Sequence, residues 1–196
     1  MSTIEQLEQL SLDDLIRIYD QEGAFEFVDG ERKPLMPPVA LHGLTIRILF
    51  RLLDAFCQTR QFGEVFTEMP YVLMYGSGWV KGSRVPDLMF FAAERWQSYT
   101  STTENWQHKP FLLVPDLAVE VVSANDLYTE LQAKVERFRA DGVKLVWVVD
   151  PHRARVDVYE GERSITLGQG DTLTGSTVMP ELEVPLKELF PEPPSP

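Results

Sequence analysis

The sequence predicts an α/β domain with a mixed central sheet flanked by helices. Two apolar runs of strand length, Leu117–Val122 and Lys144–Pro151, lie on either side of a helical segment from Asp126 to Asp141 that ends at Gly142. A strand, a helix and a strand within about 35 residues form a βαβ unit, in which parallel pairing is the default. Continuous apolar strands are typical of a sheet covered on both faces.

The length of the chain fits one such domain. Its 196 residues match the usual size of a single domain, and a chain of this length buries roughly 70% of its unfolded surface. We expect a helical extension over residues 1–23, the main domain over residues 24–190 and a proline-rich tail over residues 191–196.

Local signals place the elements before the βαβ unit. Ser11, three residues before Asp14, starts a short helix in the manner of a capping box. An alternating run over residues 25–31 ends in Asp29-Gly30, the pattern of a tight hairpin with the segment that follows it. Together they predict an N-terminal helix and hairpin.

The middle of the chain is expected to supply a long helix and two strands. Apolar residues recur at helical spacing over residues 41–60, and strand-like segments cover residues 64–74 and 85–91 with a glycine-rich turn between them. Residues 96–109 are interpreted as a loop. After the βαβ unit, residues 155–159 are expected to pair with its second strand.

Charge and cysteine content narrow the functional classes. Thirty Asp and Glu against eighteen Lys and Arg give a net charge of −12, so a nucleic acid would have to be held by local cations or a metal-filled site. The single cysteine, Cys57, excludes an internal disulfide and predicts a buried thiol in a reducing compartment. Without a signal sequence or a membrane-length apolar run, we expect a soluble, cytoplasmic protein.

Common cofactor and nucleophile motifs are absent from the sequence. No Gly-x-Gly-x-x-Gly follows a strand, and there is no Walker loop. Ser123 does not lie in a Gly-x-Ser-x-Gly elbow. Three scattered histidines with one cysteine exclude a zinc site of the Cys/His type.

Glu120 is the first residue that a purely structural chain does not explain. It lies inside the apolar run Leu117–Val122, where burial of a lone carboxylate costs several kcal/mol unless it is paired, protonated or bound to a metal. The alternative is a salt bridge, or a position at the edge of the strand from which the carboxylate reaches water.

Lys134 is the second such residue. The apolar residues of its helix share one stripe, formed by Leu127, Leu131, Val135 and Phe138. A period of 3.6 residues places Lys134 within that stripe, toward the sheet. The alternative is a packed stem whose ammonium reaches solvent. Because Glu120 lies on the strand immediately before this helix, we expect the two side chains to face each other.

Asp87 is a third candidate, at the head of an apolar strand after Pro86. Pro-Asp at a strand start is also common turn chemistry. If this strand neighbours that of Glu120, two carboxylates and an ammonium converge. Carboxylate oxygens are ligands for Mg²⁺, and an ammonium beside them orients a hydrolytic water.

Several motifs in this order resemble a known family. They are Arg84-Val85-Pro86-Asp87, Pro115–Ser123, Lys134 on a helix ending at Gly142-Val143, and Val146–Pro151. The series is similar to the Uma-two type of restriction endonucleases, within the PD-(D/E)XK nuclease superfamily. The resemblance covers about residues 24–190 and includes Glu26–Glu31, His42, Met179–Leu182 and Leu189-Phe190.

The resemblance implies a restriction-endonuclease-like core, a four-stranded mixed sheet flanked by helices. It implies that Asp87 and Glu120, helped by the Val121 carbonyl, bind Mg²⁺ or Mn²⁺ and that Lys134 is the catalytic lysine. The usual lysine of the superfamily stands two residues after the acidic ligand, where this chain has Val122. Here the resemblance places the lysine on the following helix instead.

Glu26 and His42 are lesser candidates for the same site. Glu26 alternates with two phenylalanines, so it is expected on the opposite face of its strand, most often toward solvent. His42 lies near the start of the long helix, where a histidine is more often a packing or capping residue than a ligand.

These observations predict a Mg²⁺-dependent phosphodiesterase that acts on DNA. The competing classes are a catalytically inactive nuclease fold that binds DNA or protein, and a homo-oligomeric interaction protein favoured by the aromatic content. An acidic protein gains from placing two sites on one duplex, and enzymes of this resemblance commonly cut as dimers. We therefore expect a homodimer or larger homo-oligomer, with no membrane partner.

Overall fold

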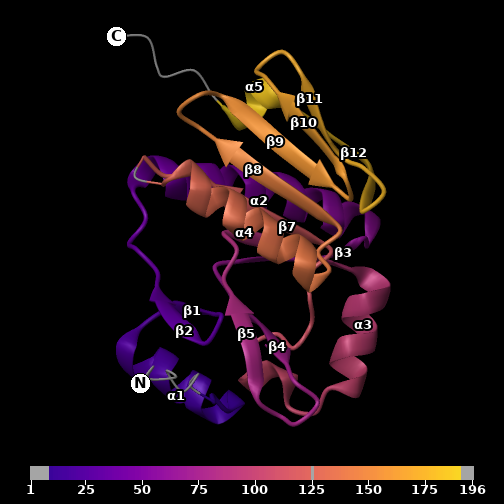
Figure 1. The fold of residues 1–196 in the computed structure, drawn as a ribbon. Helices are drawn as coiled ribbons and strands as arrows, with labels where there is room; N and C mark the ends of the chain where they lie inside the picture. The colour runs from indigo at the N-terminus through magenta and orange to yellow at the C-terminus, as the bar shows by residue number, and fades with distance from the viewer. Residues whose placement is uncertain (1–8, 125, 191–196) are drawn as a thin grey trace.

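A mixed six-stranded sheet forms the centre of the protein (Figure 1). The computed structural model describes residues 9–124 and 126–190. The strands follow the order β10-β9-β8-β7-β6-β3, with bounds β3 Gly63–Thr67, β6 Leu88–Ala92, β7 Leu117–Val121, β8 Leu145–Asp150, β9 Arg155–Glu160 and β10 Arg163–Leu167. Strands β7 and β8 run parallel and the other neighbours antiparallel. The predicted βαβ unit is confirmed, and the sheet is wider than four strands.

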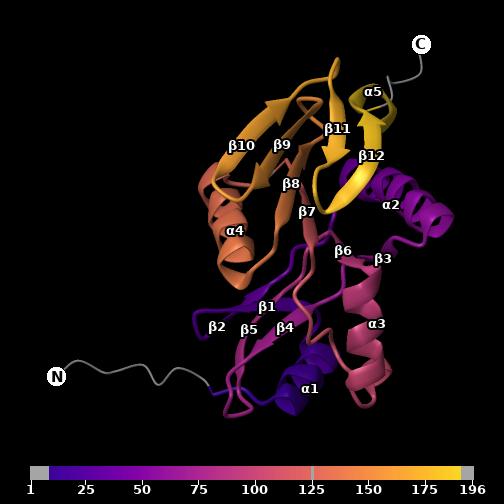
Figure 2. The same cartoon turned by 90° about the vertical axis from the view of Figure 1, so that its right-hand side faces the viewer.

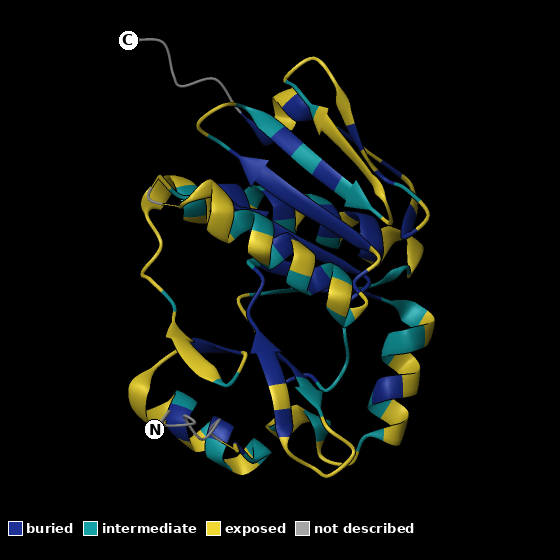
Figure 3. Ribbon diagram, in the orientation of Figure 1, coloured by how far each residue is buried: buried dark blue, intermediate teal, exposed yellow. Residues whose placement is uncertain are grey.

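Two helices cover the opposite faces of this sheet, as Figures 1 and 2 show for α2 (Ala40–Arg60) and α4 (Tyr128–Asp141). Alternate residues of β7 enter different cores. Val119 belongs to the same core as Leu49 of α2, whereas Ala118 belongs to the core that contains Phe138 of α4. Strand β8 is buried along its whole length (Figure 3), which explains why these strands are continuous apolar runs.

The N-terminal part of the chain builds a second, four-stranded sheet of order β2-β1-β5-β4. Its elements are α1 (Leu12–Glu22), β1 (Phe25–Val28), β2 (Glu31–Pro34), β4 (Tyr71–Met74) and β5 (Val80–Arg84). The Ser11 side chain accepts a hydrogen bond from the Asp14 amide at 3.1 Å, as predicted. Asp29 and Gly30 both have positive φ, 53° and 82°, which fits the tight turn predicted between β1 and β2.

The C-terminal elements pack onto the α2 side of the large sheet. Strand β11 (Thr172–Gly175) pairs with β12 (Met179–Pro185), and the short helix α5 (Leu186–Leu189) follows. Their apolar residues join the core that contains α2. The expected proline-rich tail lies outside the described residues, and the domain division at residue 23 stays a prediction. Among the described residues, no helix is long and apolar enough to cross a membrane.

The expected strand over residues 64–74 is wrong, because two strands of different sheets occupy it. Glu68 has a φ of 52° and Pro70 follows, so the chain turns between β3 and β4. The expected strand over residues 85–91 begins later, at Leu88. Pro86 has no amide for a strand ladder, so Val85 to Asp87 connect β5 of one sheet to β6 of the other.

The expectation of a loop over residues 96–109 is wrong, because helix α3 (Ala93–Thr102) extends into it and the 3₁₀ helix η1 (Trp106–His108) lies within it. Trp96 lies at the centre of an aromatic cluster, with ring centroids 5.1 Å from Phe66 and from Trp106. Long-range aromatic packing therefore stabilises this helix.

Candidate active site

Asp87 and Glu120 lie side by side on neighbouring strands. Leu88 of β6 pairs with Val119 of β7 in antiparallel register, and one further step along both strands places Asp87 opposite Glu120. Asp87 Oδ2 accepts a hydrogen bond from the Val121 amide at 2.6 Å, which fixes the carboxylate against the end of β7. The predicted adjacency of the two strands is confirmed.

Glu120 is buried beneath α4, and Lys134 reaches it from that helix. Glu120 is 4% exposed, and its Oε2 accepts a hydrogen bond from Lys134 Nζ at 2.8 Å. The expected contact between these side chains is confirmed. One member of the proposed helical stripe is wrong, because Leu127 is 60% exposed and precedes the first residue of α4.

The electrostatics of this pair reflect an excess of carboxylates. Burial raises the pKa of Glu120; the positive charge of Lys134 lowers it, and the negative charges of Asp87 and Glu26 raise it. The Glu120 carboxylate in turn raises the pKa of Lys134, so the lysine is charged at neutral pH. A cluster of this kind favours an additional cation.

His42 contacts the site through Asp87. Its Nε2 lies 3.1 Å from Asp87 Oδ1, and this hydrogen bond raises the pKa of the imidazole against the effect of burial. The His42 Nδ1 is buried without a hydrogen-bond partner among the described residues. The imidazole therefore contacts Oδ1 of Asp87, while the Val121 amide donates to Oδ2.

The expectation that Glu26 points to solvent is wrong. Glu26 is 3% exposed, and its Oε1 accepts a hydrogen bond from the Val85 amide at 3.2 Å. Strand β1 lies between β2 and β5 and is buried at all four residues, so neither of its faces meets water. The second face of β1 turns toward the chain that leads to Asp87.

The donor set fits a hard divalent cation. Glu120 Oε1 is buried and has no hydrogen-bond partner among residues 9–124 and 126–190. The Val122 amide donates to Val149 O at 2.8 Å on the β8 side. Because a trans peptide directs C=O and the next N–H to opposite sides, the Val121 carbonyl points toward the Asp87 side. Two carboxylates and a carbonyl are oxygen donors of the type that Mg²⁺ binds.

Protein side chains supply only a small part of the ligands that a cation at this site would need. Within the described ranges, no three His, Cys, Asp or Glu side chains come together as a metal-binding cluster. A cation at this site would therefore depend on main-chain oxygen and on water in addition to the two carboxylates.

Sequence reasoning gave no role to Arg84, although its motif was recognised. Its Nη1 donates to Phe27 O at 2.8 Å, and its Nε lies 3.2 Å from Asp141 Oδ2. This arginine ties β1, β5 and the end of α4 together. The sequence did offer a signal for this role. Arg84 is a charged residue at the buried end of β5, three residues before Asp87.

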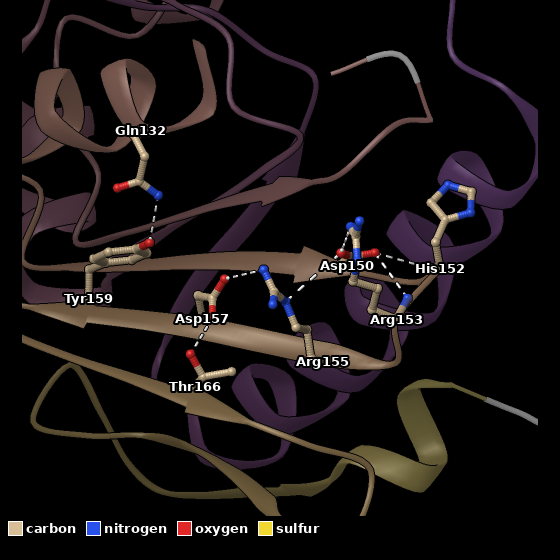
Figure 4. A network of polar contacts seen from close by, with 8 residues as sticks. All are labelled: Gln132, Asp150, His152, Arg153, Arg155, Asp157, Tyr159 and Thr166. Atoms are coloured by element: carbon tan, nitrogen blue, oxygen red, sulfur yellow. Dashed lines mark hydrogen bonds and ion pairs between the residues drawn. The ribbon is translucent and has the colours of Figure 1, made fainter. Parts of the chain in front are cut away.

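Another charged network lies where β8 turns into β9 (Figure 4). Asp150 accepts hydrogen bonds from the amides of His152 and Arg153 and from the Arg153 guanidinium. Arg155 lies 3.4 Å from Asp157 and 3.9 Å from Asp150. Both arginines are thus matched by carboxylates, and His152 contributes its main chain only.

Comparison with known proteins places the chain in a family. The family model Uma2, described as "Putative restriction endonuclease", matches residues 5–187. The chain belongs to the Uma2 family. No curated protein matches this Uma2 chain.

A solved structure supports the same fold. A protein from Anabaena variabilis ATCC 29413, described as a "putative nuclease belonging to DUF820", superposes with a TM-score of 0.75 at 20% identity. The match covers 92% of this chain and 97% of that one. The predicted restriction-endonuclease-like α/β fold is therefore confirmed.

Proposed function

We propose that this Uma2 protein is a Mg²⁺-dependent endonuclease that hydrolyses phosphodiester bonds in DNA. The observation that carries the proposal is the Lys134–Glu120 contact of 2.8 Å, with Asp87 opposite Glu120 on the next strand. Two carboxylates at the end of two buried strands can hold the metal for metal-assisted hydrolysis, and a lysine ammonium beside them can stabilise developing negative charge.

Asp87, Glu120 and the Val121 carbonyl would hold the cation. The free Oε1 of Glu120 and the surplus of negative charge support this assignment. When bound there, the ion would polarise the scissile phosphate and lower the pKa of its water. Mn²⁺ has the same preference for oxygen ligands.

Three side chains near the proposed metal ligands would have other roles in the reaction. Lys134 would orient the attacking water and stabilise the negative charge that develops on the phosphate. His42 is a positioning residue, because it touches Asp87 Oδ1 at 3.1 Å. Glu26 acts through its charge, which raises the pKa of both Glu120 and Lys134.

The alternative is a catalytically inactive nuclease fold that binds DNA or protein, or a homo-oligomeric interaction protein. The Lys134–Glu120 pair is also compatible with this alternative, because the ammonium compensates the charge of the carboxylate without a metal. The two functions differ in whether the carboxylates bind Mg²⁺ and whether phosphodiester bonds are broken.

Cleavage and metal binding together test the proposal. Purified protein is incubated with supercoiled plasmid, single-stranded DNA and RNA, with Mg²⁺ or with EDTA, and Mn²⁺ affinity is measured by calorimetry. We expect Mg²⁺-dependent cutting of DNA, which Asp87→Asn and Glu120→Gln abolish together with the metal affinity. Glu136→Gln is the control, because that carboxylate is exposed on α4 and pairs with Arg139. An inactive wild type whose cation affinity is unchanged in Asp87→Asn supports the inactive alternative.

We also infer a homodimer or larger assembly. A protein of net charge −12 that handles a polyanion gains binding strength from two sites on one duplex. Light scattering at micromolar concentration measures the mass, and a monomer would contradict this inference.

A further inference from the structure

Positive charge gathers at the C-terminal end of α4, away from the predicted metal ligands. Burial raises the pKa of Asp141, and three cations act against it, namely Arg84, Lys81 and Arg137. The Arg137 Nε is buried without a hydrogen-bond partner in the described part of the chain. These three cations, which we call the α4–β5 basic cluster, therefore outnumber the carboxylate that they share.

On the other side of the candidate active site, at the β8–β9 turn, the positive charges are paired with carboxylates. Arg153 and Arg155 lie at the β8–β9 turn, where Asp150 and Asp157 neutralise them (Figure 4). A polyanion near the candidate active site is therefore attracted toward the α4–β5 basic cluster rather than toward the β8–β9 turn.

A cavity of about 580 Å³ adjoins this cluster. It lies between the turns of the β1–β2 and β4–β5 hairpins and is lined by Tyr75, Trp79, Lys81, Arg84 and, as its acidic member, Asp29. Tyr75 is 54% exposed and Trp79 is 38% exposed. Exposed aromatic rings beside cations are the surface on which proteins stack unpaired bases while they hold the phosphates.

The basic cluster bridges the catalytic lysine and the cavity. Arg137 lies three residues after Lys134 on α4 and Asp141 four further on, about 10 Å along the helix axis in total. Arg84 meets Asp141 at 3.2 Å, and β5 then runs about 13 Å from Arg84 to Val80 at the cavity. Gly82 leaves room for this arginine, because a Cβ there would lie 2.7 Å from Arg84 Nη1.

We propose that this cavity holds an unpaired base of the nucleic acid and that Arg137 and Lys81 of the α4–β5 basic cluster guide the sugar–phosphate backbone from the catalytic centre toward it, while the buried Arg84 is held by Asp141. The inference rests on the proposed nuclease function and specifies its substrate: nucleic acid with a single-stranded segment next to the cleaved bond. Trp79 and Tyr75 supply the stacking surface, and Lys81 contacts a phosphate.

Binding without divalent metal tests the site separately from catalysis. Two fluorescent DNA probes are titrated in EDTA, a blunt hairpin duplex and the same duplex with a short oligothymidine overhang, and anisotropy is measured. We expect the overhang to bind more tightly. Trp79→Ala should weaken overhang binding about tenfold, the usual effect of losing one stacked base, whereas Trp79→Phe, which keeps a ring, should stay within threefold. Lys81→Ala should reduce the dependence of affinity on salt by about one phosphate contact.

Two controls make each outcome decisive. Lys187→Ala removes an exposed lysine on α5, at the far end of the molecule from the β4–β5 hairpin (Figures 1 and 2), and should not change the salt dependence. Tyr75→Ala provides a second cavity variant if Trp79→Ala fails to fold. Unchanged overhang affinity in the cavity variants, or an equal loss for blunt and overhang probes, would overturn the inference. Because no cleavage is involved, an inactive enzyme that shows the expected binding refutes the nuclease proposal and leaves the base site standing.

Discussion

The Nζ atom of Lys134 lies 2.8 Å from Oε2 of Glu120, although fourteen residues separate them and the lysine is on a helix rather than on the strand. A lysine two residues after Glu120 would point to the same face of the sheet, where this chain has Val122. Helix α4 covers that face and turns Lys134 inward. The ammonium therefore occupies the side of the sheet that the shorter strand motif would have supplied.

Replacing Lys134 with Met should slow catalysis strongly and lower the stability of the metal-free protein. Met keeps most of the apolar stem but removes the cation, so we expect hydrolysis to slow by about 10²- to 10³-fold. Because the change also leaves buried Glu120 without its partner, the metal-free protein should lose about 1–3 kcal/mol of stability. Single-turnover cleavage and thermal unfolding in EDTA measure the two effects.

A double variant provides the control for this result. Lys134→Met with Glu120→Gln removes both charges, so stability should recover relative to Lys134→Met, whereas cleavage should be abolished by the loss of Glu120. A Lys134→Met rate within about threefold of the wild-type rate, in protein that still binds metal, would exclude a catalytic role for the lysine.

Sequence patterns placed residues of the candidate site correctly where the pattern specifies one direction for a side chain. The phase of α4 placed Lys134 toward the sheet, and the charged residue inside an apolar run marked Glu120. The same rules misplaced Glu26, because alternation assigns a residue to a face but does not say whether another part of the chain covers that face. Tertiary coverage by the loop at Val85, 59 residues away in sequence, decided its burial.

Connections between the sheets were the other failure. Residues 64–74 and 85–91 have strand composition throughout, yet the chain turns near Glu68 between two sheets, and Val85 to Asp87 form a connection before β6. Likewise α3 is stabilised by rings from distant strands, such as Phe66 and Phe91 around Trp96. These outcomes depend on long-range partners that a window of sequence does not contain.

Glu120→Gln should stabilise the metal-free protein at alkaline pH. The folded protein raises the pKa of Glu120 above its ordinary value of 4.5, so folding favours the protonated acid. Its contribution to stability is full below that ordinary pKa and is lost as pH rises toward the raised pKa. Gln does not titrate, so its advantage over wild type should grow between pH 5 and pH 8, by on the order of 1 kcal/mol or about 2–4 °C.

Melting temperatures in EDTA at both pH values measure this difference. Glu136→Gln changes an exposed carboxylate of α4, the helix that covers Glu120, and should show no such trend. Mg²⁺ should raise the melting temperature of wild type but not of Glu120→Gln. A Glu120→Gln protein that is destabilised equally at both pH values would contradict the raised pKa of the Glu120 carboxyl.

Cys57 should resist alkylation in the native protein. It is 1% exposed within the α2 core, and burial raises the pKa of its thiol to about 12, so the reactive thiolate is scarce at neutral pH. Iodoacetamide followed by mass spectrometry should give no adduct under native conditions and complete modification in guanidinium. Rapid labelling of the folded protein would show that the α2 core opens locally.

Asp116 should anchor the fold in a pH-dependent way. Its carboxylate lies 2.8 Å from both Arg95 and Lys144 and accepts a hydrogen bond from the Ala92 amide at 3.0 Å. Burial alone would raise the pKa of Asp116, but these hydrogen bonds outweigh it and hold the pKa below its ordinary 3.8. A carboxyl of this kind stabilises the folded state above its ordinary pKa, and the stabilisation is lost as pH falls through the lowered pKa.

Asp116→Asn should therefore cost about 2 kcal/mol at pH 7, because a buried charge-assisted contact at the junction of three strands is lost. That corresponds to a fall of about 4–8 °C in melting temperature. At acid pH, below the lowered pKa, the wild-type carboxyl takes up its proton, so the difference between the two proteins should shrink. Asp20→Asn, at an exposed position of α1, serves as the control and should change stability by less than about 0.5 kcal/mol. If Asp116→Asn lowers the melting temperature by the same amount at both pH values, the loss comes from packing, and the ionised carboxylate does not anchor the start of β7.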